Sequence, residues 1–104
     1  MRYDLIVAPD AARALRDLPA RQRSEVRDAL ERHLQFEPRK TSRSRIKRLR
    51  GLSRPQYRLR VKDIRVFYDV SETTVEILAI IPKSEAQDWL DEAGTPDDGG
   101  TGPG

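Results

Sequence analysis

The stretch from Tyr57 to Val70 reads YRLRVKDIRVFYDV, and it decides the fold. Apolar side chains stand at positions 57, 59, 61, 64, 66, 68 and 70, and mostly polar ones stand between them, on either side of Lys62-Asp63. A period of two is typical of half-buried β-strands, and a two-residue connection is typical of a β-hairpin. We therefore predict two antiparallel strands, residues 57–61 and 64–70, with one face on the core.

Two further segments predict strands that complete the sheet. Residues 75–81 are apolar at nearly every position, as in a central strand covered on both faces, and a turn at Glu72-Thr73 leads into it. Residues 2–8 predict an opening strand with Tyr3, Leu5 and Val7 on one face.

Two helices are predicted between the opening strand and residue 38. Asp10 is the expected N-cap of the first helix, which Pro19 ends. The second helix runs from about Ala20 to Pro38, and its apolar face is formed by Val26, Ala29, Leu30, His33 and Leu34. Two helices that meet at a proline predict an antiparallel helical hairpin. His33 lies at the edge of the apolar face, and we expect it to be packed or half-buried rather than chemically active, because no partner residue stands at a useful spacing.

The segments predict an α+β fold in the order β-α-α-β-β-β(-α), a small, mostly antiparallel sheet with a helical hairpin on one face. Ser84 is the expected cap of a short closing helix that ends near Ala93, with Trp89 and Leu90 as its apolar contacts. We expect one domain over residues 1–93. The Gly-, Pro- and Asp-rich tail, residues 94–104, is expected to be disordered because it buries too little apolar surface.

Composition excludes several classes of site. A chain of 104 residues has room for one modest core. The absence of cysteine excludes disulfides and thiolate metal sites, and a single histidine excludes a histidine-based metal cluster or catalytic triad. We expect no metal and no cofactor. The start of the chain does not resemble a signal peptide, and no apolar run is long enough to span a bilayer, so we expect a soluble, cytoplasmic protein.

Positive charge is concentrated in the middle of the chain. Twelve of the 27 residues from Arg39 to Arg65 are Lys or Arg and only Asp63 is acidic, although the whole chain has a net charge of +3. Such a block is typical of a surface that binds a polyanion, because each Lys or Arg set against a phosphate releases counterions. A solvated basic face and a docking site for an acidic protein are the alternatives.

Within this block, residues 39–55 predict a partly ordered basic loop with a possible short strand at Ile46–Leu49. The alternation after it places Arg58 and Arg60 on one face of the hairpin, and Arg65 joins them from the next strand. Guanidinium groups bind phosphate oxygens in a bidentate manner, so an anion is a natural occupant of this face. The alternative is that the arginines form the solvent face of an amphipathic hairpin.

This order of elements, together with RLRGL at 48–52, YRLRV at 57–61 and IRVFYDV at 64–70, resembles the RelE/ParE superfamily of bacterial type II toxins. The resemblance covers residues 2–93. It implies the RelE-like microbial RNase toxin fold and a cognate antitoxin as partner. It also implies one of two activities: RelE-like members cleave mRNA in the ribosomal A site without a metal, and ParE-like members inhibit DNA gyrase.

The RelE-like branch carries basic residues on the hairpin and after the last strand, and a tyrosine on the closing helix. The resemblance assigns Arg58, Arg60 and Arg65 to phosphate binding and transition-state stabilisation. Lys83 stands where the family places an arginine, and we expect it to transfer a proton because neighbouring arginines would favour its neutral form. Trp89 replaces the tyrosine; it can stack on an RNA base or anchor the helix, but it has no ionisable hydroxyl.

Three functions remain open at this point: a ribosome-dependent mRNA endoribonuclease that inhibits translation, a gyrase inhibitor without catalysis, and a toxin relic that only binds an antitoxin. The four basic matches, Arg58, Arg60, Arg65 and Lys83, favour the nuclease, and the missing tyrosine favours the gyrase inhibitor or a slow nuclease. The expected RNA contacts outside the hairpin face are Arg43, Arg45, Lys47, Arg48, Arg50 and Trp89.

Overall fold

A computed structural model describes residues 1–97 of the chain. Its elements are β1 (Asp4–Val7), α1 (Pro9–Asp17), α2 (Ala20–Ala29), a π-helical turn η1 (Leu30–Leu34), β2 (Ile46–Arg48), β3 (Leu52–Arg54), β4 (Tyr57–Val61), β5 (Ile64–Val70), β6 (Thr74–Pro82), α3 (Lys83–Ala93) and β7 (Thr95–Pro96). The predicted α+β order is confirmed.

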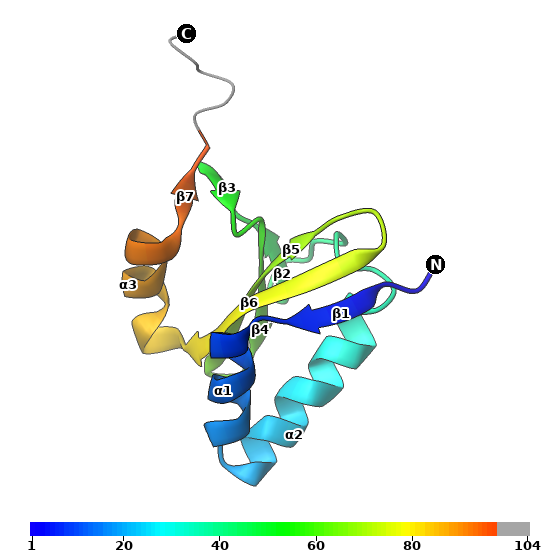
Figure 1. The fold of residues 1–104 in the computed structure, drawn as a ribbon, viewed down its shortest axis with the longest axis vertical. Helices are drawn as coiled ribbons and strands as arrows, with labels where there is room; N and C mark the ends of the chain where they lie inside the picture. The colour runs from blue at the N-terminus through cyan, green and yellow to red at the C-terminus, as the bar shows by residue number, and fades with distance from the viewer. Residues whose placement is uncertain (98–104) are drawn as a thin grey trace, which may run out of the picture.

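Five strands form one sheet in the order β1-β6-β5-β4-β2. Every pairing is antiparallel except β1 with β6, which is parallel. The helical hairpin carries the chain from β1 at one edge of the sheet to β2 at the other edge. The predicted hairpin turn is confirmed: Lys62 adopts a positive φ of 54° and its ammonium pairs with Glu25 of α2. Figure 1 shows α1 and α2 together on one side of the sheet and α3 apart from them, beyond β6.

The core lies between the helical hairpin and one face of the sheet. Leu59, Val66 and Ile77 from the sheet are fully buried there, and Val26 and Leu34 from the helical segment are also inside. Their transfer from water supplies the main stabilising free energy. Because side chains alternate along β4 and β5, burial of this face sends the intervening residues to the opposite, open face.

Tyr68 ties the end of the helical segment to the sheet. Its ring stacks on that of Tyr57 with centroids 5.4 Å apart, and its buried hydroxyl donates to the carbonyl of Pro38 at 2.8 Å. Burial raises the pKa of Tyr68 well above its ordinary value. Pro38 is itself fully buried, so the chain is held firmly where it leaves the helices.

A bulge in β6 changes the pattern of its apolar residues. Phe67 pairs with Ala79 but Tyr68 pairs with Ile77, so Leu78 is the additional residue. A bulge re-aims side chains, and Leu78 lines a groove on the open face instead of the core. This explains why β6 is apolar at nearly every position: it serves two apolar surfaces, as the sequence predicted.

Both predicted helix caps are wrong. α1 begins at Pro9 with Ala8 as its N-cap, and Asp10 pairs with Arg13 inside the first turn at 3.3 Å. Proline suits the first helical position because its φ is already helical and it lacks the N–H that would be unpaired. α3 begins directly after β6 with Pro82 as its N-cap, so Ser84 lies within the helix and makes no cap hydrogen bond.

The basic segment contains more strand than the sequence indicated. Its short strand at residues 46–48 is confirmed and pairs with β4. A second strand, β3, was not predicted and pairs with β7, which falls in the tail expected to be disordered. Ordered structure therefore continues past Ala93 as far as Asp97, and residues 98–104 lie outside the described part of the chain. The second helix also ends in an unpredicted π turn, η1.

Candidate nucleic-acid interface

The hairpin brings three arginines together on the open face of the sheet. Arg60 is directly opposite Arg65 in the β4–β5 register, and Arg58 is two residues along from Arg60 on the same side. Cβ atoms of directly opposed residues lie about 5 Å apart. The predicted convergence of Arg58, Arg60 and Arg65 is therefore present in the structure.

Arg58 is the arginine that the fold constrains most. It is half-buried, and its Nε is buried without a hydrogen-bond partner in residues 1–97. Burial lowers the pKa of Arg58, and the charges of Arg65 and Arg60 lower it further. Buried polar groups are nearly always paired. An unpaired N–H beside two other cations indicates a place where an anion would be stabilised.

Arg65 has a structural task as well. Its Nη1 donates to the carbonyl oxygens of Lys62 at 2.7 Å and Ile64 at 3.1 Å, which holds the hairpin turn in place. Burial lowers the pKa of Arg65, Arg60 lowers it further, and Asp63 opposes them. A guanidinium carries several donors, so Nε and Nη2 of Arg65 remain for an anion. Arg60 is exposed.

The surroundings of Lys83 differ from the expectation. Its Nζ lies 3.5 Å from Oδ1 of Asp63, and its backbone N–H donates to the Asp63 carbonyl at 2.8 Å. Its ion-pair partner is thus a carboxylate. An ammonium can stabilise a developing negative charge or donate a proton, but it has no electron pair with which to accept one.

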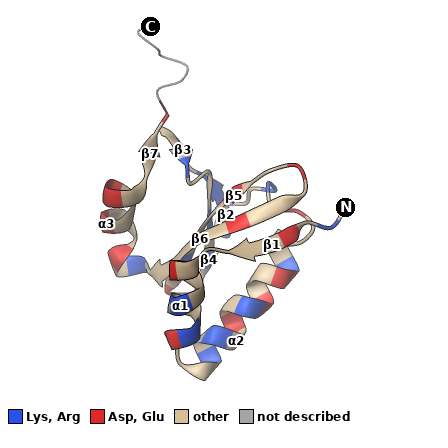
Figure 2. Ribbon diagram, viewed as in Figure 1, with Lys and Arg blue, Asp and Glu red and all other residues tan. Residues whose placement is uncertain are grey.

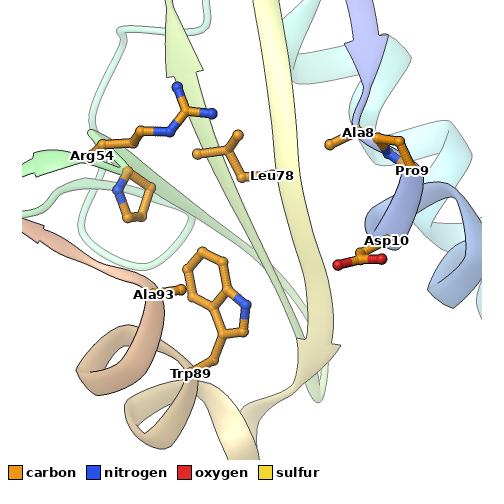
Figure 3. Close-up of a pocket in the computed structure, with 8 residues that line it drawn as sticks. Ala8, Pro9, Asp10, Arg54, Leu78, Trp89 and Ala93 are labelled. Carbon is orange, nitrogen blue, oxygen red and sulfur yellow. The ribbon is translucent and has the colours of Figure 1, made fainter.

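Trp89 joins α3 to the sheet. Its ring stacks on Phe67 with centroids 5.1 Å apart and 14° between the planes, and Phe67 is the cross-strand neighbour of Arg58. α3 has no fully buried residue, and this stack is one of its contacts with the sheet. Trp89 also lines a groove of about 470 Å³, with Leu78, Arg54 and Ala93 near its ring and Asp10 on the opposite wall (Figure 3).

The predicted RNA contacts of the basic loop separate into three groups. Lys47 is directly opposite Arg58 in the β2–β4 register and so extends the arginine face. Arg48 lies on the helix side, where its guanidinium is 5.4 Å from the Tyr57 ring centroid and donates to the carbonyls of Leu49 and Gln56. Arg45 also lies on the helix side, near His33. Arg43 and Arg50 are exposed outside the strands.

Charge is arranged by face and element. Figure 2 shows acidic residues along α3 and basic residues along the segment that contains β2 and β3. Arg58, Arg60, Arg65 and Lys47 on the open face are called the arginine face below. The Phe67–Trp89 stack lies at one end of it, and α3 continues beyond.

A family model described as the ParE toxin of the type II toxin–antitoxin system parDE matches residues 5–87. The chain belongs to this toxin family. The chain is also similar to solved toxin–antitoxin complexes. No curated protein sequence matches it.

Three solved structures share the toxin's fold. The archaeal RelE–RelB complex from Pyrococcus horikoshii OT3 matches with 30% identity and a TM-score of 0.57 over 80% of this chain and 97% of that one. The RelBE2 complex from Mycobacterium tuberculosis matches with 25% identity and a TM-score of 0.55 over 79% and 99%. The RelB–RelE complex from Methanococcus jannaschii, at 17% identity, a TM-score of 0.54 and 82% and 98% coverage, shows the fold alone. The predicted membership of the RelE/ParE superfamily is confirmed.

Sequence reasoning missed a polar network on the toxin's open face. Nη1 of Arg54 lies 3.2 Å from Oδ2 of Asp69 and 3.4 Å from Oε1 of Glu76. Oδ1 of Asp69 accepts from the backbone N–H of Gln56 at 2.7 Å. Burial raises the pKa of Asp69, and the contacts with Gln56 and Arg54 oppose that rise. The outward position of Asp69 on β5 was the available signal, but its partners Arg54 and Gln56 come from β3 and from the loop before β4.

Asp63 was also missed as a site residue. It is the single acid in the basic block, and that isolation was a signal in the sequence.

Within residues 1–97, no group of three or more metal-ligating side chains is present. In the same part of the chain, no helix has the length and apolar character needed to cross a membrane.

Proposed function

We propose that this toxin inhibits translation by cleaving mRNA in the ribosomal A site, with the arginine face as its phosphate-binding surface. The observation that carries the proposal is the unpaired, buried Nε of Arg58 beside Arg60 and Arg65. A fold that holds three cations together and leaves one donor unpaired is organised for an anion that arrives with a ligand. A phosphodiester supplies that anion.

The proposed reaction is attack by a ribose 2′-oxygen on the adjacent phosphorus. The new P–O2′ bond forms as the P–O5′ bond breaks; the 2′-hydroxyl loses its proton and the departing 5′-oxygen gains one. The products are a 2′,3′-cyclic phosphate and a free 5′-hydroxyl. Negative charge accumulates on the phosphoryl oxygens between these events. Arg58, Arg60 and Arg65 would stabilise that charge, which is often the largest catalytic contribution.

Proton transfer is the weaker part of this site. Arginine exchanges protons poorly, Trp89 has no hydroxyl, and Lys83 is paired with Asp63. We assign Lys83 the task of stabilising or protonating the departing 5′-oxygen, with Asp63 positioning it. Since general acid–base groups typically contribute 10²- to 10⁴-fold, cleavage should be slow compared with an enzyme that has a dedicated base.

An antitoxin is the proposed physiological partner. The similar structures from Pyrococcus horikoshii and Mycobacterium tuberculosis are toxin–antitoxin complexes. A small partner with an acidic, helix-forming segment would cover the arginine face and satisfy the donors of Arg58. Association should weaken as salt rises if exposed charges guide the encounter.

Inhibition of DNA gyrase without catalysis is the second candidate. The match to a model described as a ParE toxin favours it, as does Trp89, which has no ionisable hydroxyl for proton transfer. In this reading the arginine face binds an acidic protein surface or DNA. A relic that only binds its antitoxin would show neither activity.

Two assays run together separate these functions. Translation reactions programmed with a defined mRNA are sampled for new 5′ ends, and the same preparations are tested for inhibition of gyrase supercoiling. Cuts confined to A-site codons in wild type, and reduced in Arg58→Met but not in Arg21→Ala, support the nuclease. Arg21 is an exposed cation on α2 and matches the charge change. Gyrase inhibition without cuts would replace the proposal with the second candidate.

A further inference from the structure

A second basic site lies on the helix side of β2, away from the arginine face. It is a hollow of about 170 Å³ between the end of the helical segment and the chain leading into β2. His33 from η1 and Arg45, just before β2, line it, and the hydroxyl residues Thr41 and Ser42 line the same hollow. Its volume is sufficient for a phosphate group.

The walls of this hollow are fixed by the fold. Oγ of Ser42 accepts from the backbone N–H groups of Arg45 at 3.0 Å and Ile46 at 3.2 Å. The carbonyl of Arg45 accepts from the N–H of Arg60 at 2.8 Å, which joins this segment to the hairpin. On the other side, buried Pro38 accepts from Tyr68. A site built on such supports loses little entropy when a ligand binds.

The charges that face the hollow leave one cation without a counterion. Arg32 pairs with Asp28 at 3.1 Å and Lys40 pairs with Glu37 at 3.6 Å. The guanidinium of Arg45 forms no ion pair within residues 1–97. It is therefore the group in this hollow most available to a ligand, and it carries a positive charge.

His33 reports the same electrostatic environment. Burial lowers the pKa of His33, the charges of Arg45 and Arg32 lower it further, and Asp28 opposes them. An anion in the hollow would oppose the lowering of the His33 pKa by the two arginines and would be a hydrogen-bond partner for the imidazolium. The π turn that contains His33 is a second indication, because π-helical turns occur frequently at functional sites.

We propose that this hollow is a phosphate-binding site, in which Arg45 holds the phosphate oxygens and His33 adds a second charged donor when it is protonated. Two sources share this chemistry, inorganic phosphate and a phosphodiester of RNA. If the ligand is RNA, its backbone would contact both sides of β2, with Lys47 on the arginine face and Arg45 on the helix side. That assignment of the source rests on the proposed function, whereas the phosphate chemistry does not.

The single histidine of the chain makes a direct test possible. The ring protons of His33 are followed by NMR from pH 5 to pH 8 at constant ionic strength, without ligand, with inorganic phosphate, and with a short oligouridylate whose phosphodiesters stay charged throughout. A bound anion beside the ring should raise the pKa of His33 by about one pH unit. By reciprocity, oligouridylate should bind about tenfold more tightly at the acid end of the range.

Variants connect the effect to the hollow. Arg45→Ala should abolish the ligand-induced shift, and Lys40→Ala serves as a second lining variant if Arg45→Ala proves unstable. Arg21→Ala removes one cation about 18 Å along the helix from His33 and should leave the shift unchanged. A shift with oligouridylate identifies RNA as a source, and a shift with phosphate alone identifies the free ion.

Two outcomes would overturn the proposal: no shift with either probe, or the same shift in Arg45→Ala as in wild type. Neither depends on ribosomes or on cleavage. If the wild-type protein cuts no mRNA but still shows the ligand-induced rise in the pKa of His33, the proposed function is wrong and the phosphate site remains supported.

Discussion

Replacing Arg58 by Met should stabilise the fold while it removes function. The unpaired Nε of Arg58 and its two cationic neighbours are costs that the folded state carries in the absence of an anion. Met keeps an unbranched apolar chain of similar length beside Phe67, the cross-strand neighbour. The substitution removes the charge and the unpaired donor without opening a large cavity.

The expected size of the effect follows from two contributions. Leaving a buried donor unpaired costs about 1–3 kcal/mol, and the lower end applies because Arg58 is only half-buried. Repulsion from each neighbouring arginine adds roughly 0.7 kcal/mol at about 6 Å in water, less with salt. The free energy of unfolding should rise by about 1–2 kcal/mol. The transition state for cleavage should lose about 2–4 kcal/mol of stabilisation, so the cleavage rate should fall roughly 30- to 1,000-fold.

Urea denaturation of wild type, Arg58→Met and Arg60→Met measures the stability change. Arg60 is the matched control because it lies on the same face and carries the same charge but is exposed. Its replacement also relieves repulsion from two arginines but removes no buried unpaired donor, so it should stabilise the fold by about 1 kcal/mol less than Arg58→Met does. The reasoning fails if Arg58→Met lowers stability by about 1 kcal/mol, or if both variants stabilise the fold equally. The difference in free energy of unfolding between wild type and Arg58→Met should become smaller as salt rises, because salt screens the repulsion between the arginines.

Three further predictions concern other parts of the molecule. Trp89→Ala should lower the free energy of unfolding by about 2 kcal/mol in urea titrations, since it removes the aromatic stack that joins α3 to Phe67. Trp89→Phe should recover most of this loss of stability, and equal losses in the two variants would show that the stack contributes little. The free energy of unfolding should fall as pH drops below about 6.5, because the folded state disfavours protonated His33 while the unfolded state does not. His33→Gln should remove this dependence, and its persistence in that variant would refute the assignment. Lys47→Ala should reduce the slope of log binding constant against log salt for single-stranded RNA by about 0.7; an unchanged slope would place Lys47 outside the interface.

The hairpin and its arginines could be predicted from sequence because they depend on local periodicity. Alternation in residues 57–70 reports which face of a strand is buried, and the arginines follow from that face. The helix stop at Pro19 is similarly local, because proline lacks the N–H that a helix requires. These features identified the family, the α+β fold and the position of the arginine face without any tertiary information.

Partners that come from distant segments were decided only by the tertiary structure. Lys83 pairs with Asp63 instead of lying among arginines, and Arg45 lies across the hollow from His33. Spacing along the chain specifies the face on which a side chain lies, but not which residue of another element faces it. Which residues of two elements face each other depends on the register of strand pairing and on how the helices pack against the sheet, because these determine which distant groups are buried side by side.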